Sequence, residues 1–199
     1  MARAGDVLEN PVTGLQTIFR KTAQDTEGEL LQVDWIGKAG WKAGPKHVHP
    51  YQEERFTVLS GTLASYVDGA ERVHGPGEVV TAPASSVHTV WNAGDGVVHA
   101  LVEFRPALRS EVPLETLARL ARDGKTNKEG VPKNLLRAAL LFHDYEDEIY
   151  LARPPLFVQR AIFGALAAVG RLLGYRAEYP YPHAERREAS PARGGSATG

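Results

Sequence analysis

The residues best suited to chemistry in this 199-residue chain are three histidines and one glutamate. His47 and His49 stand two positions apart, so on a β-strand their side chains would lie on the same face. Glu54 follows shortly afterwards, and His88 comes from a later segment. Imidazole and carboxylate ligands suit Fe(II), Mn(II), Ni(II), Cu(II) and Zn(II) alike. We predict that these four side chains hold one divalent metal, with one or two coordination positions open for water, substrate or dioxygen.

Strand parity favours Glu54 over its neighbour Glu53 as the carboxylate ligand. Glu54 shares a strand face with the apolar Phe56, which should point into the core, whereas Glu53 lies on the opposite face. The offset from His49 to Glu54 is odd, so both can face inward only if the strand is interrupted between them. Pro50 is well placed for such a break, because proline cannot donate to a sheet.

Three aromatic residues near the predicted ligands are candidates for substrate contact. Phe56 has the inward parity of Glu54, and Tyr51 and Tyr66 lie close to the ligands in sequence. Ordinary core packing is the alternative for each ring. The sequence holds no Gly-rich phosphate loop and no G-x-S-x-G nucleophile motif, so the catalytic residues stay unassigned.

The predicted ligands lie in a segment, residues 1–107, whose pattern is that of β-structure. Short runs rich in β-branched and aromatic residues alternate with turns of Gly, Pro, Asp and Asn. Many short strands with regular turns are typical of a sandwich or barrel. A parallel α/β sheet is disfavoured, because no helical pattern separates these runs.

Residues 108–177 are predicted to form an α-helical extension. Apolar residues recur there at helical spacing, and Pro154 and Pro155 predict a break before a last helix from about Pro155 to Gly174. Residues 178–199, rich in Pro, Arg, Gly and Ala, are predicted to be a disordered tail. Within the extension, His143 and Asp147 could form a metal pair four residues apart on a helix, although an exposed acidic face is the more ordinary interpretation.

The nearly all-apolar stretch from Leu156 to Leu173 needs a partner, since each large exposed side chain forgoes about 1.5–3 kcal/mol. We favour packing on protein, with peripheral membrane contact through residues 155–174 and a true membrane span as the alternatives. Gly164, Ala168 and Gly170 are small enough to permit close helix approach in either setting.

Composition excludes several function classes. Lys and Arg number 23 against 24 Asp and Glu, a net charge of -1, which argues against a dedicated nucleic-acid binder. The absence of cysteine excludes disulfides, Cys-ligated zinc, iron–sulfur clusters and thiol nucleophiles. The first residues contain no apolar run typical of a secretory signal, so we expect a cytoplasmic protein, possible membrane association aside.

Two separated segments of the chain resemble the two signature motifs of the cupin superfamily. The first motif ends in His-x-His, then Glu, then Gly, and the matching residues are His47, His49, Glu54 and Gly61. The second motif contains Gly, Pro, His and Asn at fixed spacing, and the matching residues are Gly77, Pro83, His88 and Asn92. Two positions depart from the pattern: Gly40 precedes the first His by one residue too many, and Ser85 replaces a glycine.

The cupin resemblance implies a mainly β protein, a jelly-roll β-barrel followed by a C-terminal α-helical extension, with a three-histidine, one-glutamate metal site. It implies a metal-dependent enzyme acting on a small organic molecule, with dioxygenase-like oxidation as the favoured reaction. A non-oxidative isomerase, lyase or cyclase is one alternative. Another is a non-catalytic ligand-binding cupin whose helices bind a partner or membrane. The resemblance also implies a homodimer.

Overall fold

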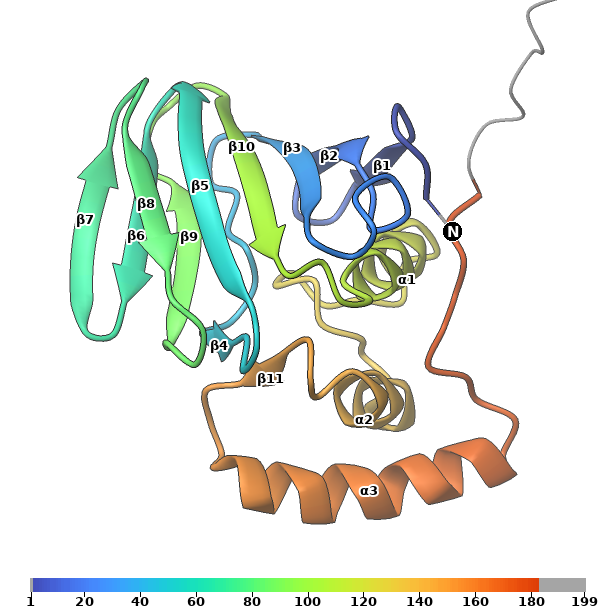
Figure 1. Cartoon of the computed structure of the whole chain (residues 1–199). Coiled ribbons are helices and arrows are strands. Elements are labelled where there is room, and N and C mark those ends of the chain that lie inside the picture. Colours follow the sequence, from blue (N-terminus) through green and yellow to red (C-terminus); the bar gives the residue numbers. More distant parts are fainter. Residues whose placement is uncertain (1, 183–199) are drawn as a thin grey trace, which may run out of the picture.

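The computed structural model describes residues 2–182, which form a layered β-structure with helices along one side (Figure 1). The helices are α1 (Glu111–Arg122), α2 (Leu135–Asp144) and α3 (Leu156–Leu172). They all follow the strands that carry the predicted metal ligands. The mainly β class with a C-terminal helical extension is therefore confirmed.

One sheet has six antiparallel strands among the described residues. Their spatial order is β1 (Val7–Asn10), β2 (Leu15–Lys21), β3 (Leu31–Gly37), β10 (Val98–Arg105), β5 (Glu53–Ser60) and β8 (Val79–Ala82). Burial alternates along β10: Val98, Ala100 and Val102 are buried, while the residues between them are half-buried. This is the period-two pattern of a strand with one face on the core.

The second sheet has five strands in the described part of the chain. Their order is β11 (Tyr150–Leu151), β4 (His47–Val48), β9 (His88–Asn92), β6 (Leu63–Val67) and β7 (Ala70–His74). The edge strand β11 belongs to the region predicted as helical extension, and it pairs with β4 through Tyr150 opposite Val48 and Leu151 opposite His47. The extension thus completes the sheet that carries two of the predicted ligands.

The core lies between the two sheets. Phe56 and Val58 contribute from one sheet and Leu63 and Val90 from the other, and all four side chains are buried. The burial of Phe56 and Val58 confirms the strand parity inferred from the sequence. Ala118 of α1 joins the same cluster, so the first helix also packs on the sheets.

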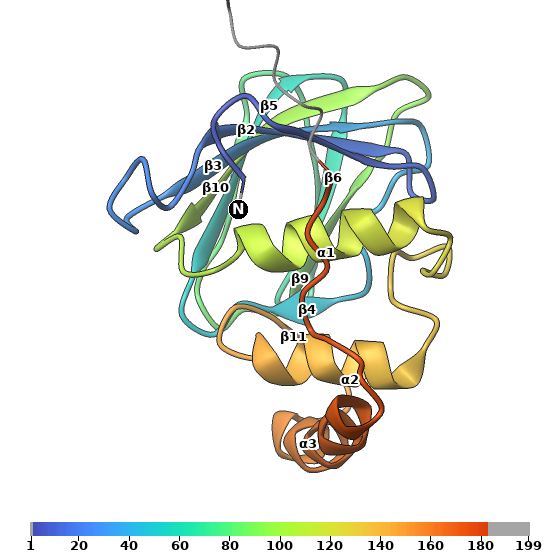
Figure 2. The same ribbon diagram turned by 90° about the vertical axis from the view of Figure 1, so that its right-hand side faces the viewer.

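Helix α3 is a separate element that starts directly after Pro154 and Pro155, as the sequence predicts. It lies against α2, on the side away from the sheets (Figures 1 and 2). The rings of Phe142 and Phe163 stack with centroids 6.0 Å apart. At Gly170, a Cβ atom would lie 3.0 Å from Leu140 Cδ1, so the absence of a side chain at this position allows α3 to approach α2 closely.

The opposite face of α3 is uncovered. Phe157 is 74% exposed and Leu172 is 87% exposed, and Ile162 and Val169 are exposed as well. Across residues 2–182, no helix has both the length and the apolar character needed to cross a bilayer.

The chain continues past α3 along α1 (Figure 2). The hydroxyl of Tyr181 accepts a hydrogen bond from the backbone N–H of Glu9 at 3.2 Å, and the N–H of Tyr179 donates to Thr116 Oγ1 at 3.1 Å. These residues belong to the start of the predicted tail. Its remainder, residues 183–199, lies outside the described residues.

Candidate metal centre

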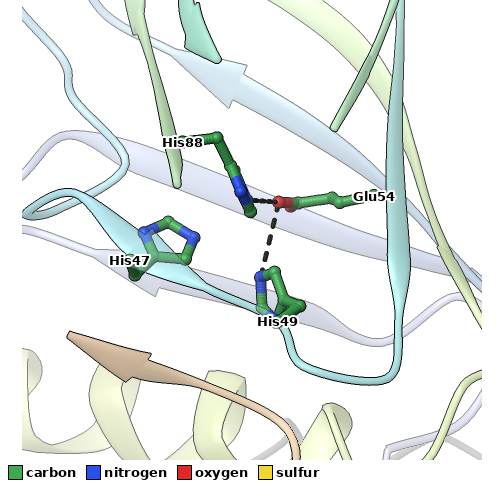
Figure 3. A group of neighbouring side chains, drawn as sticks. All are labelled: His47, His49, Glu54 and His88. Carbon is green, nitrogen blue, oxygen red and sulfur yellow. Dashed lines mark hydrogen bonds and ion pairs between the residues drawn. The ribbon is translucent and has the colours of Figure 1, made fainter. Parts of the chain in front are cut away.

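The four predicted ligands meet at one point, and all four side chains are buried (Figure 3). One potential ligand atom from each of His47, His49, Glu54 and His88 lies within 4.8 Å of the others. Two atoms each bonded to one metal at about 2.0–2.2 Å can be no more than about 4.4 Å apart. Small side-chain adjustments therefore suffice to bring the set to bonding distance.

Strand register brings the histidines together. His47 on β4 is paired directly opposite His88 on β9, and their ring centroids are 4.5 Å apart. The chain leaves the strand at His49 and re-enters the other sheet at β5, so the break expected at Pro50 is present. As a result Glu54 is only 1% exposed and faces the histidines, whereas Glu53 is half-buried.

The turn between the two sheets is anchored by a side chain that the sequence analysis did not single out. Gln52 is fully buried, and its Nε2 donates to the backbone carbonyls of Pro106 at 2.8 Å and Ala107 at 2.9 Å. Ser110 Oγ donates to Gln52 Oε1 at 3.1 Å. This network fixes the chain between His49 and Glu54, and with it the relative placement of the two ligands.

Each histidine is oriented by a backbone carbonyl. A carbonyl oxygen can only accept, so Nδ1 carries the proton in every case and Nε2 is left to face the centre. The three pairs are His47 with Pro45 (2.9 Å), His49 with Glu148, and His88 with Ser86 (3.1 Å). Such outer hydrogen bonds hold the ring and tautomer that a metal ligand requires.

Glu54 is the acceptor at the middle of the cluster. Its Oε2 accepts from His88 Nε2 at 2.8 Å and lies 3.5 Å from His49 Nε2 (Figure 3). Burial by itself would raise the pKa of Glu54, but the hydrogen bonds and charge of His49 and His88 outweigh it and hold this pKa well below its usual range. The carboxylate is therefore ionised at neutral pH.

The histidines differ in their preference for a proton. Burial, together with His49 and His88 nearby, lowers the pKa of His47 to about 3, so this imidazole is neutral. Burial is the largest single influence on the pKa of His88 and acts to lower it, but the hydrogen bond and charge of Glu54, with smaller contributions from Ser86 and Asp68, together outweigh burial and raise this pKa. His47 thus presents a lone pair, while His88 shares a proton that a metal ion would displace.

The residues present fit a divalent cation. Glu54 Oε1 is buried and has no hydrogen-bond partner among the described residues, which is costly for a carboxylate oxygen. A cation bound by the three Nε2 atoms would satisfy this oxygen and balance the carboxylate charge. Ligands of this type are common to several transition metals, so the donor set selects no single one.

A cavity of about 170 Å³ adjoins the cluster, and His47, His49 and Glu54 form part of its wall. Most of the remaining wall is apolar. The strands contribute Leu8, Leu15, Trp35 and Phe104, the segment between β3 and β4 contributes Trp41, and the helical extension contributes Leu114, Leu117, Leu141, Phe142 and Ile149. A small molecule in this cavity would contact both the cluster and the extension.

The cavity wall, as traced over residues 2–182, includes none of the three aromatic residues predicted to contact substrate. Phe56 is buried in the core beside Trp35, with ring centroids 5.8 Å apart. Tyr51 is 61% exposed, and Tyr66 stacks under Lys46 Nζ, 3.1 Å from its ring centre. Their contact with substrate stays a prediction that this cavity does not support.

His143 and Asp147 do not lie four residues apart on one helix, as the metal pair considered for the extension would require. Helix α2 ends at Asp144, so Asp147 lies beyond it and the helical relation to His143 is not formed. The apolar run of α2 stops before the acidic cluster, which accounts for the early end. Among the described residues, His47, His49, Glu54 and His88 are the group of three or more that could hold a metal.

The site depends on residues far away in sequence that reasoning from the sequence missed. Glu148 supplies the carbonyl for His49, and its carboxylate accepts from Arg109 Nε at 2.8 Å. Arg109 also lies over the ring of Tyr145, 4.7 Å from its centre. No local pattern marks these residues, because their role follows from the pairing of β11 with β4.

Comparison with known proteins agrees with a cupin domain in this chain. The Cupin domain family matches residues 35–104. The chain is 28% identical over 199 aligned residues to an oxidoreductase of Arthrobotrys oligospora, covering 86% of this chain and 76% of that protein. It is 32% identical over 66 residues to quercetin 2,3-dioxygenase of Bacillus subtilis, covering 33% of this chain but 19% of that enzyme.

Among solved structures, an RmlC-like cupin from Shewanella frigidimarina is 20% identical with a TM-score of 0.46, covering 56% of this chain and 94% of the other. The family match includes all four clustered residues, His47, His49, Glu54 and His88. Residues 35–104 of this chain are therefore a domain of the cupin superfamily.

Proposed function

We propose that this protein binds one divalent transition metal through His47, His49, Glu54 and His88 and is a metal-dependent enzyme, a dioxygenase-like oxidoreductase acting on a small organic molecule. One observation carries the proposal: a buried set of three imidazoles and one carboxylate forms part of the wall of an apolar cavity. A ligand set that borders a cavity can serve catalysis, whereas a structural metal site is closed by its ligands.

A bound metal would supply Lewis-acid polarisation of a substrate oxygen and, if redox-active, reactivity toward dioxygen. The chain supplies the rest. The apolar wall excludes water around the reacting group, which strengthens each polar contact there. His47, His49 and Glu54, which form part of the cavity wall, would place the bound metal beside that reacting group.

Two relatives support oxidation as the reaction type. One, similar along most of its length, is named an oxidoreductase, and another, similar over 66 residues, is a quercetin 2,3-dioxygenase. The second likeness covers only 33% of this chain and 19% of that enzyme. The substrate of this protein therefore has to be found by assay.

The test begins with elemental analysis of the purified protein, followed by oxygen-electrode assays after loading with Fe(II) or Mn(II). Enolic and phenolic compounds are the first substrates to offer. Oxygen uptake that depends on both metal and compound, and that is lost in Glu54→Gln but kept in Glu53→Gln, supports the proposal. Metal binding without oxygen uptake against any such compound contradicts the oxidative reaction.

The alternatives give different outcomes in the same assays. An isomerase, lyase or cyclase would work with a redox-inert metal and without oxygen. A non-catalytic cupin would bind a ligand without turnover, and its helices would bind a partner or membrane. The uncovered face of α3, which includes Phe157 and Leu172, is the feature that favours an additional contact. The homodimer and the peripheral membrane contact expected from the sequence both stay predictions.

A further inference from the structure

One face of helix α1 closes the cavity beside the metal cluster. The wall residues of this region recur at intervals of three and four positions, which places them on a single helix face: Ser110, Pro113, Leu114, Leu117 and Ala118. Leu114 and Ala118 also pack in or against the hydrophobic core, whereas Leu117 lies outside that cluster of the described residues. Leu117 is half-buried, so a change at this position alters the cavity and leaves the core intact.

Phe104 connects the apolar wall to the metal cluster. Its ring packs edge-on against the imidazole of His49, with centroids 5.7 Å apart, and both residues belong to the wall. Phe104 also contacts the ring of Trp35, another wall residue, with centroids 6.2 Å apart. A molecule that binds the cluster through one oxygen would therefore have its carbon skeleton against aromatic and aliphatic side chains.

The charged side chains of the wall disfavour a charged ligand. Over residues 2–182, Lys42 is the one lysine or arginine in the wall, and it is exposed, with its Nζ 6.0 Å from the ring centre of Trp91. The wall also includes the carboxylates of Glu54, Glu129 and Glu148, and carboxylates therefore outnumber the cation. A carboxylate or phosphate on the body of a ligand would lose water here without gaining a buried positive partner.

The size of the cavity sets the second restriction. A cavity of about 150 Å³ lined by Leu, Ile and Phe binds one benzene molecule, and this cavity measures about 170 Å³. We infer that its ligand is an uncharged, mostly apolar molecule of about one substituted ring, which presents one oxygen to the metal cluster, and that Leu117 limits its size. This inference names the substrate class of the proposed enzyme and rests on that function.

The experiment compares three ring compounds on the metal-free protein. Para-cresol has one ring and one hydroxyl, 2-naphthol has two fused rings and one hydroxyl, and para-hydroxybenzoate adds a carboxylate to the single ring. Calorimetric titration of the full chain in EDTA should show para-cresol binding at least about tenfold more tightly than 2-naphthol, since even one methylene too many in a filled apolar pocket is worth that much. Para-hydroxybenzoate should also bind at least about tenfold more weakly than para-cresol, because its charge is left without a partner.

Leu117→Ala tests the size limit. The change removes as many carbon atoms as 2-naphthol has beyond para-cresol, so the variant should bind 2-naphthol at least about tenfold more tightly than the wild type does. Leu136→Ala is the matched control, because Leu136 is a half-buried leucine of α2 outside the cavity wall traced over residues 2–182. This control should keep the wild-type affinities for all three compounds.

The inference is overturned if the wild type binds 2-naphthol or para-hydroxybenzoate as tightly as para-cresol, or binds none of the three. Equal affinities of Leu117→Ala and Leu136→Ala for 2-naphthol overturn the role of Leu117. Circular dichroism checks that each variant is folded, and Leu114→Ala, on the same face of α1, takes the place of Leu117→Ala if that variant does not fold. Since EDTA removes metal, a failure here leaves metal binding and oxygen uptake, the tests of the proposed enzyme, unaffected.

Discussion

The imidazole Nδ1 of His49 is hydrogen-bonded to the backbone carbonyl of Glu148, a residue 99 positions further along the chain. His49 lies in the cupin domain, and Glu148 lies two residues before β11, the strand that the extension adds to the sheet. The orientation of a predicted metal ligand is therefore set by the helical extension. This relationship makes the extension part of the candidate metal centre as well as part of the cavity wall.

Loosening this link should weaken metal binding. Arg109→Met removes the partner of the Glu148 carboxylate, and we expect about a tenfold loss of Mn(II) or Zn(II) affinity by calorimetry, the lower end of what outer hydrogen-bond partners are worth. Arg119→Met is the control, since Arg119 pairs with Asp123 on the surface of α1. Equal affinities of the two variants would show that the extension does not orient His49.

Glu54→Gln should abolish or nearly abolish metal binding while the protein stays folded. The amide keeps the shape but loses the negative charge that balances the cation, so the loss should exceed the 10–100-fold typical of an outer partner. The matched change Glu53→Gln, on the other face of β5, should leave affinity unchanged. Elemental analysis after dialysis gives the metal content of each variant, and similar metal content in both would refute the assignment.

Without metal, the protein should lose stability as the pH falls from about 6.5 to about 3. Over this interval the unfolded chain protonates His47 at its ordinary pKa of 6.5, whereas burial holds the folded pKa at about 3. The unfolded state then binds more protons and is favoured. The depressed pKa of Glu54 acts in the same direction below its ordinary value of 4.5, and the raised pKa of His88 opposes both.

Thermal unfolding in EDTA at a series of pH values checks this linkage. The variant His47→Gln should show a shallower fall in unfolding temperature between pH 6.5 and pH 4 than the wild type. Parallel curves for the two proteins would mean that His47 is readily protonated in the folded state, contrary to its buried position.

Gly170→Leu should destabilise the packing of α3 on α2. A Cβ at this position already meets Leu140 Cδ1 at 3.0 Å, and overpacking of this kind costs about 1–3 kcal/mol of unfolding free energy. Ala168→Leu, at an exposed position of the same helix, is the control and should change stability by less than about 0.5 kcal/mol. Urea unfolding followed by circular dichroism measures both, and equal stabilities would argue that α3 does not pack tightly on α2.

The protein is expected to be a homodimer, so light scattering at micromolar concentration should give twice the chain mass of 21.6 kDa. If the apolar face of α3 takes part, the charged variant Leu172→Glu should shift the mass toward that of the monomer. Peripheral membrane contact would instead appear as co-sedimentation with anionic vesicles that the same variant abolishes. If wild type and Leu172→Glu are both monomers and neither binds the vesicles, the dimer and the membrane contact are both contradicted.

The local sequence determined much of the cupin domain. Alternation between apolar and polar positions is enough to assign strands and to orient Glu54 inward, because successive strand residues point to opposite faces. The break at Pro50 and the start of α3 after Pro154 follow equally well, since proline restricts its own backbone and that of its neighbour. The spacing of His47, His49, Glu54 and His88 was likewise enough to gather them as one candidate site.

Only the tertiary structure decided the features that depend on contacts between segments distant in sequence. Strand β11 is two residues long, and so short a run has no pattern of its own; its place comes from pairing with β4. Trp35 and Leu141 line one cavity because the fold brings α2 beside the strand that holds Trp35. Phe56 points inward, as its strand parity predicts, but it packs in the core and not in the cavity wall. Parity assigns a side chain to a face of a strand, but the part of that face left open to a ligand depends on what else packs there.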